Sequence, residues 1–404
     1  MAPNEVRALG ELAADTLDVT ITTPVQGVHE TVAARVFRAV GPASEPTRVI
    51  HDRISSAVYR ALRSVAAAAG PTAGAAAEAL SGSREVRVLE GSPRGRFARA
   101  AINALVGDRL EARTSEIGIE MTVRAGGRDV SLSPSGIAAA FPAPTRRLAL
   151  FVHGLGEDET AWRLRAAAHR GATYGSRLRR DLGFTPVYVR YNSGLHISEN
   201  GRRLTSLIEM LVASWPAPVD EIALIGHSMG GLVARSACHE AVSAGHEWLP
   251  RTRHLVFLGS PHLGAPLEKL VNAGSWALEI AAESRPFAAV INARSAGIKD
   301  LRFGYVSDHD WRGHEPDALL RNTRRALPAS KALTFHHVAA TLTAGRDHPV
   351  AVIAGDLLVR YASATGRGIP AARATTGHFG RRTHFDLLND PEVYAHIRAA
   401  LSDS

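Results

Sequence analysis

Residues 226–231 (GHSMGG) contain a serine whose neighbours suit nucleophilic chemistry. They follow an apolar strand-like run, 221–226 (EIALIG), and precede a helical pattern. A serine hydroxyl projects toward a substrate only from a very sharp strand-to-helix turn, so the positions two before and two after it must be tiny, as Gly226 and Gly230 are. The free N–H groups at a helix start also favour developing negative charge. The pattern therefore predicts that Ser228 is a nucleophile.

A plain glycine-rich turn and a phosphate-binding loop are the alternative interpretations of this segment. A phosphate loop needs the pattern GxxxxGK[ST] and a dinucleotide site needs GxGxxG, and neither pattern occurs there. Cys238 is the only cysteine and falls within the following helix, where we expect core packing rather than a second nucleophile. A single cysteine also excludes a disulfide framework and a cysteine zinc site.

Strands and helices alternate on both sides of Ser228. Apolar strand patterns occupy 147–152, 186–190, 221–226, 254–259 and 335–342, and helical patterns occupy 160–182, 202–214 and 230–244. Strands of this apolarity, separated by helices, predict a mostly parallel sheet that is covered on both faces. Two shorter runs, 117–124 and 128–132, flank an Ala-Gly-Gly turn and predict a β-hairpin before this region.

The first 112 residues have a different, helical character. Helices are predicted at 23–41, at 50–70 and around Phe97, Ile102, Leu105 and Val106, ending before Gly107. Their apolar faces are expected to pack against another helix or a domain, with a membrane or partner surface as the alternative. We therefore predict a helical extension over 1–112 and an α/β domain over 113–404.

A less regular insertion interrupts the α/β pattern at approximately 264–333, where a cap or lid would lie. Six of its apolar residues could line an acyl pocket or simply pack within the cap: Leu267, Leu270, Val271, Trp276, Leu278 and Ile280.

Composition limits the class of protein. The chain has 404 residues, 45% of them hydrophobic and 21% charged, and a net charge of +8, which fits a folded protein with a large core. Basic residues are interleaved with acidic ones, without a long basic run, so nucleic-acid binding is not expected, whereas weak attraction to anionic lipid stays open. The sequence has no secretory-signal pattern and no run of about 18–20 apolar residues, so we expect a cytoplasmic protein.

From about residue 113 onward the motifs resemble those of the α/β-hydrolase superfamily. Residues 151–156 (FVHGLG), at the end of an apolar strand, are similar to the His-Gly segment of lipases and esterases. This resemblance implies an oxyanion hole formed by the backbone N–H groups of Leu155 and Met229. It also places His153 and Gly154 at the border of the site, with His153 expected to order its loop.

The same resemblance implies the order serine, acid, histidine along the chain. Residues 352–359 (VIAGDLLV) are similar to the Gly-Asp-Gly segment that carries the acid in bacterial lipases, although Leu357 stands where glycine is commoner. Asp356 is flanked by apolar residues, so we expect it to be partly buried and to need a partner such as an imidazole. Asp347 is the alternative acid.

The base is expected near the C-terminal end. Residues 383–388 (THFDLL) resemble the terminal His-Phe/Leu-Asp-Leu-Leu segment of lipase-like hydrolases, which implies that His384 is the base. His378 is the alternative. With these assignments, His384 would remove the proton of Ser228 while Asp356 holds the imidazole tautomer, and neither a metal nor a cofactor would be required.

Residues 258–266 (LGSPHLGAP), together with the segment around Ser228, resemble lipases and the GPI inositol-deacylase-like group of hydrolases. The resemblance places Ser260, His262 and His227 beside the site and implies cleavage of carboxylic esters with lipid-like or bulky acyl groups. A thioesterase, amidase or acyltransferase would use the same three catalytic residues. A non-catalytic scaffold whose N-terminal helices bind a partner or a membrane is the alternative of a different class, and the oligomeric state stays open.

Overall fold

The computed structural model describes residues 89–90, 92–112, 117–265, 294–314, 322, 324 and 333–402. The described residues divide into two compact units, one within 89–119 and 294–295 and the other within 120–265 and 296–402. The helices predicted at 23–41 and 50–70 lie outside the described residues, as do the six apolar residues named in the insertion. The predicted domain boundary at 112/113 therefore stays a prediction.

The smaller unit contains helix α5 (Pro93–Ala112). A helix ending before Gly107 was predicted here; the first helical segment ends at a kink at Val106, where φ is −140°, and a second segment continues to Ala112. Asn103 is buried in α5, and its amide donates to the Ile117 carbonyl (2.8 Å) and accepts from the Ile119 N–H (2.9 Å). These bonds hold 117–119 against α5, so the strand predicted from residue 117 begins only at Thr122.

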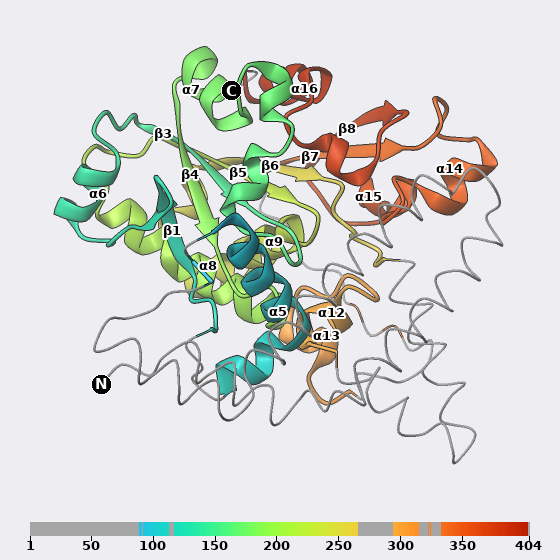
Figure 1. Ribbon diagram of the computed structural model, residues 1–404, viewed down its shortest axis with the longest axis horizontal. Helices are drawn as coiled ribbons and strands as arrows, with labels where there is room; N and C mark the ends of the chain where they lie inside the picture. The colour runs from blue at the N-terminus through green and yellow to red at the C-terminus, as the bar shows by residue number, and fades with distance from the viewer. Residues whose placement is uncertain are drawn as a thin grey trace. The chain divides into compact units, whose positions relative to one another are not determined.

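The larger unit contains an eight-stranded sheet, ordered β2-β1-β4-β3-β5-β6-β7-β8 (Figure 1). Its strands are β1 (Thr122–Ala125), β2 (Arg128–Asp129), β3 (Arg147–Val152), β4 (Phe184–Arg190), β5 (Glu221–His227), β6 (Thr252–Leu258), β7 (Thr334–Thr341) and β8 (Arg373–Gly380). The six strands from β4 to β8 in this order run parallel, and β1 is antiparallel to both of its neighbours. The predicted mostly parallel sheet and the hairpin are both present.

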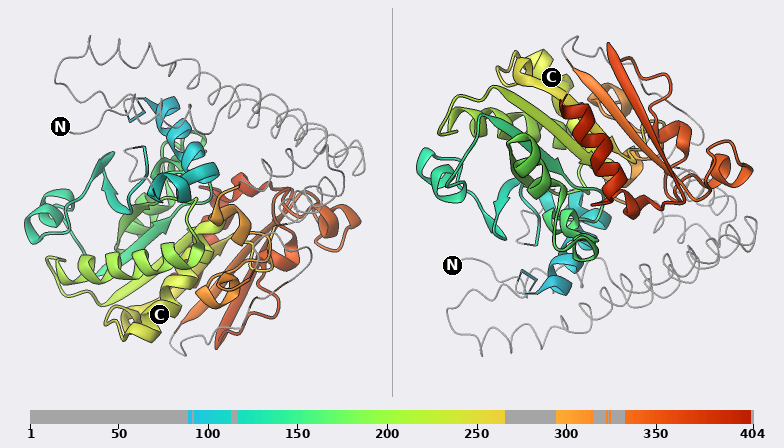
Figure 2. Two further views of the ribbon diagram at one scale, coloured as in Figure 1. Left: turned by 90° about the horizontal axis from the view of Figure 1, so that it is seen from below. Right: turned by 90° about the horizontal axis from the view of Figure 1, so that it is seen from above.

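Helices cover both faces of this sheet. They are α6 (Pro134–Ala140), α7 (Tyr174–Leu182), α8 (Ile197–Ala213), α9 (Met229–Ala244), α12 (Ala296–Asp300), α13 (Asp308–Trp311), α14 (Pro349–Ala354), α15 (Tyr361–Ala364) and α16 (Pro391–Ser402). Figure 2 shows α7 and α16 over one face and α8 and α9 over the other. None of the described helices has the length and apolar character that spanning a bilayer requires.

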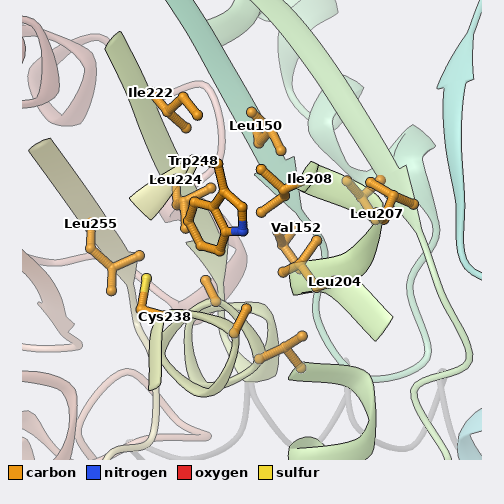
Figure 3. Close-up of a cluster of buried hydrophobic side chains, with 14 of the residues drawn as sticks. Leu150, Val152, Leu204, Leu207, Ile208, Ile222, Leu224, Cys238, Trp248 and Leu255 are labelled. Carbon is orange, nitrogen blue, oxygen red and sulfur yellow. The ribbon is translucent and has the colours of Figure 1, made fainter. Parts of the chain in front are cut away.

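The core follows from the alternation of side chains along each strand. On β3, Leu148, Leu150 and Val152 pack toward α8 and α9, whereas Ala149 and Phe151 pack toward α7 and α16. In the α8–α9 layer, the buried Trp248 lies among leucine and isoleucine side chains from β3, β5 and α8 (Figure 3). Burial on both faces explains why these strands have continuous apolar sequences.

Two local predictions were wrong. The helix predicted over 160–182 is broken into two 3-10 helices, Glu159–Arg163 and Ala166–His169, followed by α7. Arg165 and Arg170 adopt positive φ angles (62° and 56°), which a continuous helix does not allow. Strand β8 was not predicted, because its first four residues (RATT) are exposed at the sheet edge and form no apolar run.

Candidate active site

Ser228 lies in the turn that joins β5 to α9. Its backbone has φ 52° and ψ −123°, a conformation that costs about 1–3 kcal/mol for a residue with a side chain and persists only where the surroundings enforce it. The Ser228 N–H donates to the Leu258 carbonyl (2.8 Å), which ties the turn to the end of β6. Ser228 is partly exposed, whereas Met229 is buried.

Gly226 and Gly230 allow this turn because backbone atoms of other residues lie very close to their α-carbons. A Cβ on Gly226 would lie 2.3 Å from the Gly231 nitrogen, and a Cβ on Gly230 would lie 2.2 Å from the Val152 carbonyl oxygen. Both distances are far shorter than any real contact of a methyl group. The requirement for glycine two residues on either side of Ser228 is therefore steric.

His384 and Asp356 form a buried pair. The Nδ1 atom of His384 lies 2.7 Å from Oδ2 of Asp356, and the two side chains are only 2% and 0% exposed. The other carboxylate oxygen of Asp356 accepts the N–H groups of Leu358 (3.0 Å) and Val359 (2.8 Å). Burial alone would lower the pKa of His384, but the carboxylate of Asp356, with a contribution from Glu157, raises it above the ordinary value.

The Nε2 atom of His384 is buried and has no hydrogen-bond partner among the described residues. The ring lies against Gly259, the residue that follows β6, where a Cβ would come within 2.9 Å of the His384 Cε1 atom. Since the Ser228 N–H bonds to Leu258, both the serine turn and the histidine ring adjoin the carboxyl end of β6.

The alternative acid and base do not join this pair. The Asp347 side chain is 95% exposed and pairs with Arg346 (3.8 Å). His378 bonds through Nε2 to the Thr341 hydroxyl (2.8 Å). Of the two predicted acids, it is Asp356 that contacts an imidazole.

The loop after β3 approaches the serine closely. A Cβ on Gly154 would lie 3.1 Å from Cβ of Ser228. The N–H of Gly154 donates to Glu157 Oε2 (2.7 Å) and that of Gly156 to the Ser193 hydroxyl (3.1 Å). The N–H of Leu155, which lies between these two glycines, has no acceptor in the described part of the chain. Met229 begins α9, so its N–H has no acceptor within the helix.

His153 is buried and bonded at both ring nitrogens. Nδ1 lies 2.9 Å from the Gly154 carbonyl oxygen, and Nε2 accepts the Tyr191 N–H (3.2 Å), while the Tyr191 ring stacks on the imidazole. Burial lowers the pKa of His153, so the ring is neutral near pH 7. This side chain orders its loop and has no free nitrogen with which to carry a proton.

Ser260 and His262 are fully buried beyond the end of β6. A Cβ on Gly231 would lie 2.0 Å from the Ser260 hydroxyl oxygen, so this serine lies directly beside α9. The guanidinium of Arg235 donates to His262 Nδ1 (3.1 Å), and burial together with the positive charge of Arg235 keeps the pKa of His262 well below its usual value. His262 is therefore neutral and lies between α9 and the Phe257 ring of β6.

Glu157 is a residue of the site that the sequence analysis missed. Its carboxylate pairs with His227, the residue before the serine, with His227 Nδ1 2.9 Å from Oε1. Burial by itself would raise the pKa of Glu157, but His227 and the Gly154 N–H together lower it. The sequence signal that could have identified Glu157 is a carboxylate three residues after Gly154, the glycine of the His-Gly segment.

Within the described residues, His, Cys, Asp and Glu side chains form no group of three or more that could hold a metal ion. The site as described consists of a strained serine, a buried carboxylate–imidazole pair and backbone N–H groups from two turns.

A family model matches this chain, and several solved structures are similar to it. A family model described as PGAP1-like alpha/beta domain matches residues 145–364, which is more than half of the chain. No curated protein matches the chain. Solved structures similar to it include a mature lipase of Bacillus licheniformis (16% identity, 63% of this chain and 91% of that chain, TM-score 0.40). Others are a thioesterase from the prodiginine pathway of Streptomyces coelicolor (17%, 64% and 91%, 0.36) and an esterase of Rhodococcus sp. (14%, 64% and 92%, 0.34). The chain belongs to the PGAP1-like alpha/beta domain family, and its eight-stranded sheet is mostly parallel.

Proposed function

We propose that this protein is a serine hydrolase that cleaves carboxylic esters through Ser228, His384 and Asp356. The observation that carries the proposal is the buried Asp356–His384 pair, whose outer nitrogen has no partner and which adjoins the same strand end as the strained serine. A carboxylate–imidazole pair next to a nucleophile is the arrangement that activates a serine hydroxyl.

The geometry supports a specific tautomer. Because Asp356 accepts at Nδ1, the neutral imidazole carries its proton there and presents a lone pair at Nε2. As Ser228 attacks the acyl carbonyl, His384 takes the hydroxyl proton at Nε2, and Asp356 stabilises the resulting imidazolium. The N–H groups of Leu155 and Met229 would receive the negative charge on the carbonyl oxygen.

The tetrahedral intermediate formed by this attack then collapses to the acyl-enzyme, which water afterwards hydrolyses. His384, protonated in the first step, donates its proton to the leaving alkoxide, so that the alcohol departs and the imidazole is neutral again. Water enters, His384 removes one of its protons, and the hydroxide adds to the acyl carbon. The tetrahedral intermediate expels Ser228, which regains its proton, and the acid is released.

We propose lipid-like or bulky acyl esters as the substrate class, on the basis of the apolar composition of the 264–333 insertion. A thioesterase or an acyltransferase would use the same three residues, because the leaving group and the acceptor that enters after acylation are selected elsewhere in the site. Rates on p-nitrophenyl esters of short and long acyl chains, measured beside acyl-CoA substrates, separate these classes.

A fluorophosphonate probe tests the nucleophile directly. We expect it to label the wild-type protein at Ser228 and to leave Ser228→Ala unlabelled and inactive. The matched control is Ser243→Ala, which removes an exposed serine of α9 and should label like the wild type. Labelling or ester hydrolysis that persists in Ser228→Ala would contradict the proposal, and absence of labelling in the wild type would favour a non-catalytic scaffold.

A further inference from the structure

The carboxylate of Glu157 joins two turns of the site. Its Oε2 atom accepts the Gly154 N–H (2.7 Å), and both oxygens face Nδ1 of His227, at 2.9 Å and 3.1 Å. A Cβ on Gly154 would lie 3.1 Å from Cβ of Ser228, and His227 directly precedes Ser228 in the chain. One side chain, only 11% exposed, therefore connects the loop after β3 with the end of β5.

His227 extends this connection to a third segment. Its Nε2 atom lies 3.4 Å from the backbone carbonyl oxygen of His384, and the two imidazole rings are 4.8 Å apart. A carbonyl oxygen only accepts hydrogen bonds, so Nε2 of His227 must carry a proton. The His227 ring is fully buried, which holds it between the carboxylate of Glu157 and the backbone of His384.

We propose that Glu157 is a positioning residue for the hydrolysis proposed above. Through Gly154 it holds the loop after β3, which contains Leu155. Through His227 it holds the backbone of His384. The inference rests on the proposed function, because positioning matters only if Ser228 and His384 react. The three segments are not adjacent in sequence. A rigid connection between them keeps the backbone N–H donors, Ser228 and His384 in fixed relative positions.

The charge of Glu157 adds a second effect. It contributes to the raised pKa of His384, alongside the larger contribution of Asp356. The titratable groups that face Glu157 are His227 and His153, with Tyr191 and the His384–Asp356 pair beyond them.

Two substitutions test these connections. In Glu157→Gln the amide oxygen can accept the Gly154 N–H while the amide NH₂ donates to Nδ1 of a neutral His227 that keeps its proton on Nε2. Both connections are retained, although Nδ1 of His227 gives up the proton that it donates to the carboxylate in the wild type. In Glu157→Ala both connections are lost.

The measurements are the separate values of kcat and KM and the melting temperature. For Glu157→Gln, which keeps both connections, we expect near-normal kcat, KM and melting temperature. For Glu157→Ala we expect kcat to fall by roughly 10²-fold with little change in KM, since a small misplacement of reacting groups has effects of this size.

Glu159→Gln is the matched control. Glu159 is buried two residues further along, but its carboxylate pairs with Arg124 (3.1 Å) and Arg190 (2.6 Å) rather than with the serine turn. We expect its loss to lower the melting temperature without lowering kcat. This contrast distinguishes positioning from a merely structural role.

A wild-type kcat in Glu157→Ala, or a kcat in Glu157→Gln as low as that of Glu157→Ala, would overturn the inference. If Glu157→Ala does not fold, Glu157→Asp decides, because its side chain is one methylene too short to hold both turns at once. We expect it to lower kcat, and a wild-type kcat there would also overturn the inference. Failure of the proposed function has a different signature, because the wild type would then escape fluorophosphonate labelling or Ser228→Ala would remain active.

Discussion

Asp356 and His384 are joined twice, although they are 28 residues apart. The carboxylate accepts at the imidazole Nδ1 (2.7 Å), and the backbone N–H of His384 donates to the backbone carbonyl of Asp356 (3.0 Å). The first contact orients the ring and the second holds the segment that carries it. A side-chain substitution at position 356 can therefore remove the charge while the backbone bond remains.

Asp356→Asn should abolish most activity without unfolding the protein. Oδ1 of Asp356 accepts two backbone N–H groups, so the amide oxygen of asparagine would stay there and its NH₂ would face His384 Nδ1. Nδ1 would then have to accept, and the proton would move to Nε2, where a lone pair is needed. We expect kcat to fall by roughly 10³–10⁴-fold with a near-normal melting temperature. Asp347→Asn is the control with unchanged rate, and substantial kcat in Asp356→Asn would refute the assignment.

Leu357 occupies a backbone conformation that suits glycine. Its φ is 95°, and the glycine-rich motif that this segment resembles has glycine at the position. Leu357→Gly should leave the free energy of unfolding unchanged or raise it by up to about 1 kcal/mol, because relief of strain offsets the added freedom of the unfolded chain. Leu358→Gly, one residue later and without positive φ, should lower it by about 1 kcal/mol or more. Urea denaturation of both variants checks the contrast, and equal losses would argue against strain.

Gly230→Ala should disrupt the serine turn. The added methyl group would meet two backbone oxygens, those of Val152 and His153, at 2.2 Å and 2.3 Å. Since backbone atoms cannot turn aside as a flexible side chain can, we expect a loss of at least about 1–3 kcal/mol in the free energy of unfolding and a large loss of fluorophosphonate labelling. Gly345→Ala has open space around its Cβ and serves as the control. Normal stability and labelling in Gly230→Ala would contradict the described turn.

Stability should fall as the pH falls below about 6.5. Burial lowers the pKa of both His336 and His337 from 6.5 to about 4, so these rings stay neutral in the folded protein while the unfolded chain takes up protons. Between these values each such histidine lowers the free energy of unfolding by up to about 1.4 kcal/mol per pH unit. His384 acts in the opposite direction, because its raised pKa contributes stability that is lost as the pH rises through it. Urea denaturation from pH 7.5 to 5 measures the sum.

His337→Gln isolates one contribution to this pH dependence. Glutamine does not titrate, so the variant should lose less stability between pH 7.5 and 5 than the wild type does. A slope identical to that of the wild type would show that His337 takes up its proton equally in the folded and unfolded states.

Cys238 should not react with alkylating agents in the folded protein. It is buried in α9, and burial raises the pKa of its thiol to about 12, so almost no thiolate forms at pH 8. We expect iodoacetamide to modify it only in denaturant and to leave ester hydrolysis unchanged under native conditions. Rapid native labelling, followed by mass spectrometry, would show that this helix opens.

The amino-acid sequence by itself determined the features that depend on short-range contacts. The strands β3, β5, β6 and β7 were predicted within one or two residues, because burial on both sheet faces requires continuous apolar runs. The serine turn was recognisable for a similar reason, since the close approach that demands Gly226 and Gly230 arises within a few residues of Ser228. The motif resemblance supplied Asp356 and His384 as candidates.

Only the tertiary structure decided which of the candidate acids and bases meet. Asp347 and Asp356 are nine residues apart in sequence, yet Asp347 is exposed and Asp356 is buried against His384. The segment that carries His384 is distant in sequence, and the folded chain brings it to Asp356 only. The Glu157–His227 connection has the same origin, since it joins the ends of two strands that are neighbours only through the sheet. Contacts between residues far apart in sequence depend on how the strands are ordered, and that order is a property of the folded chain.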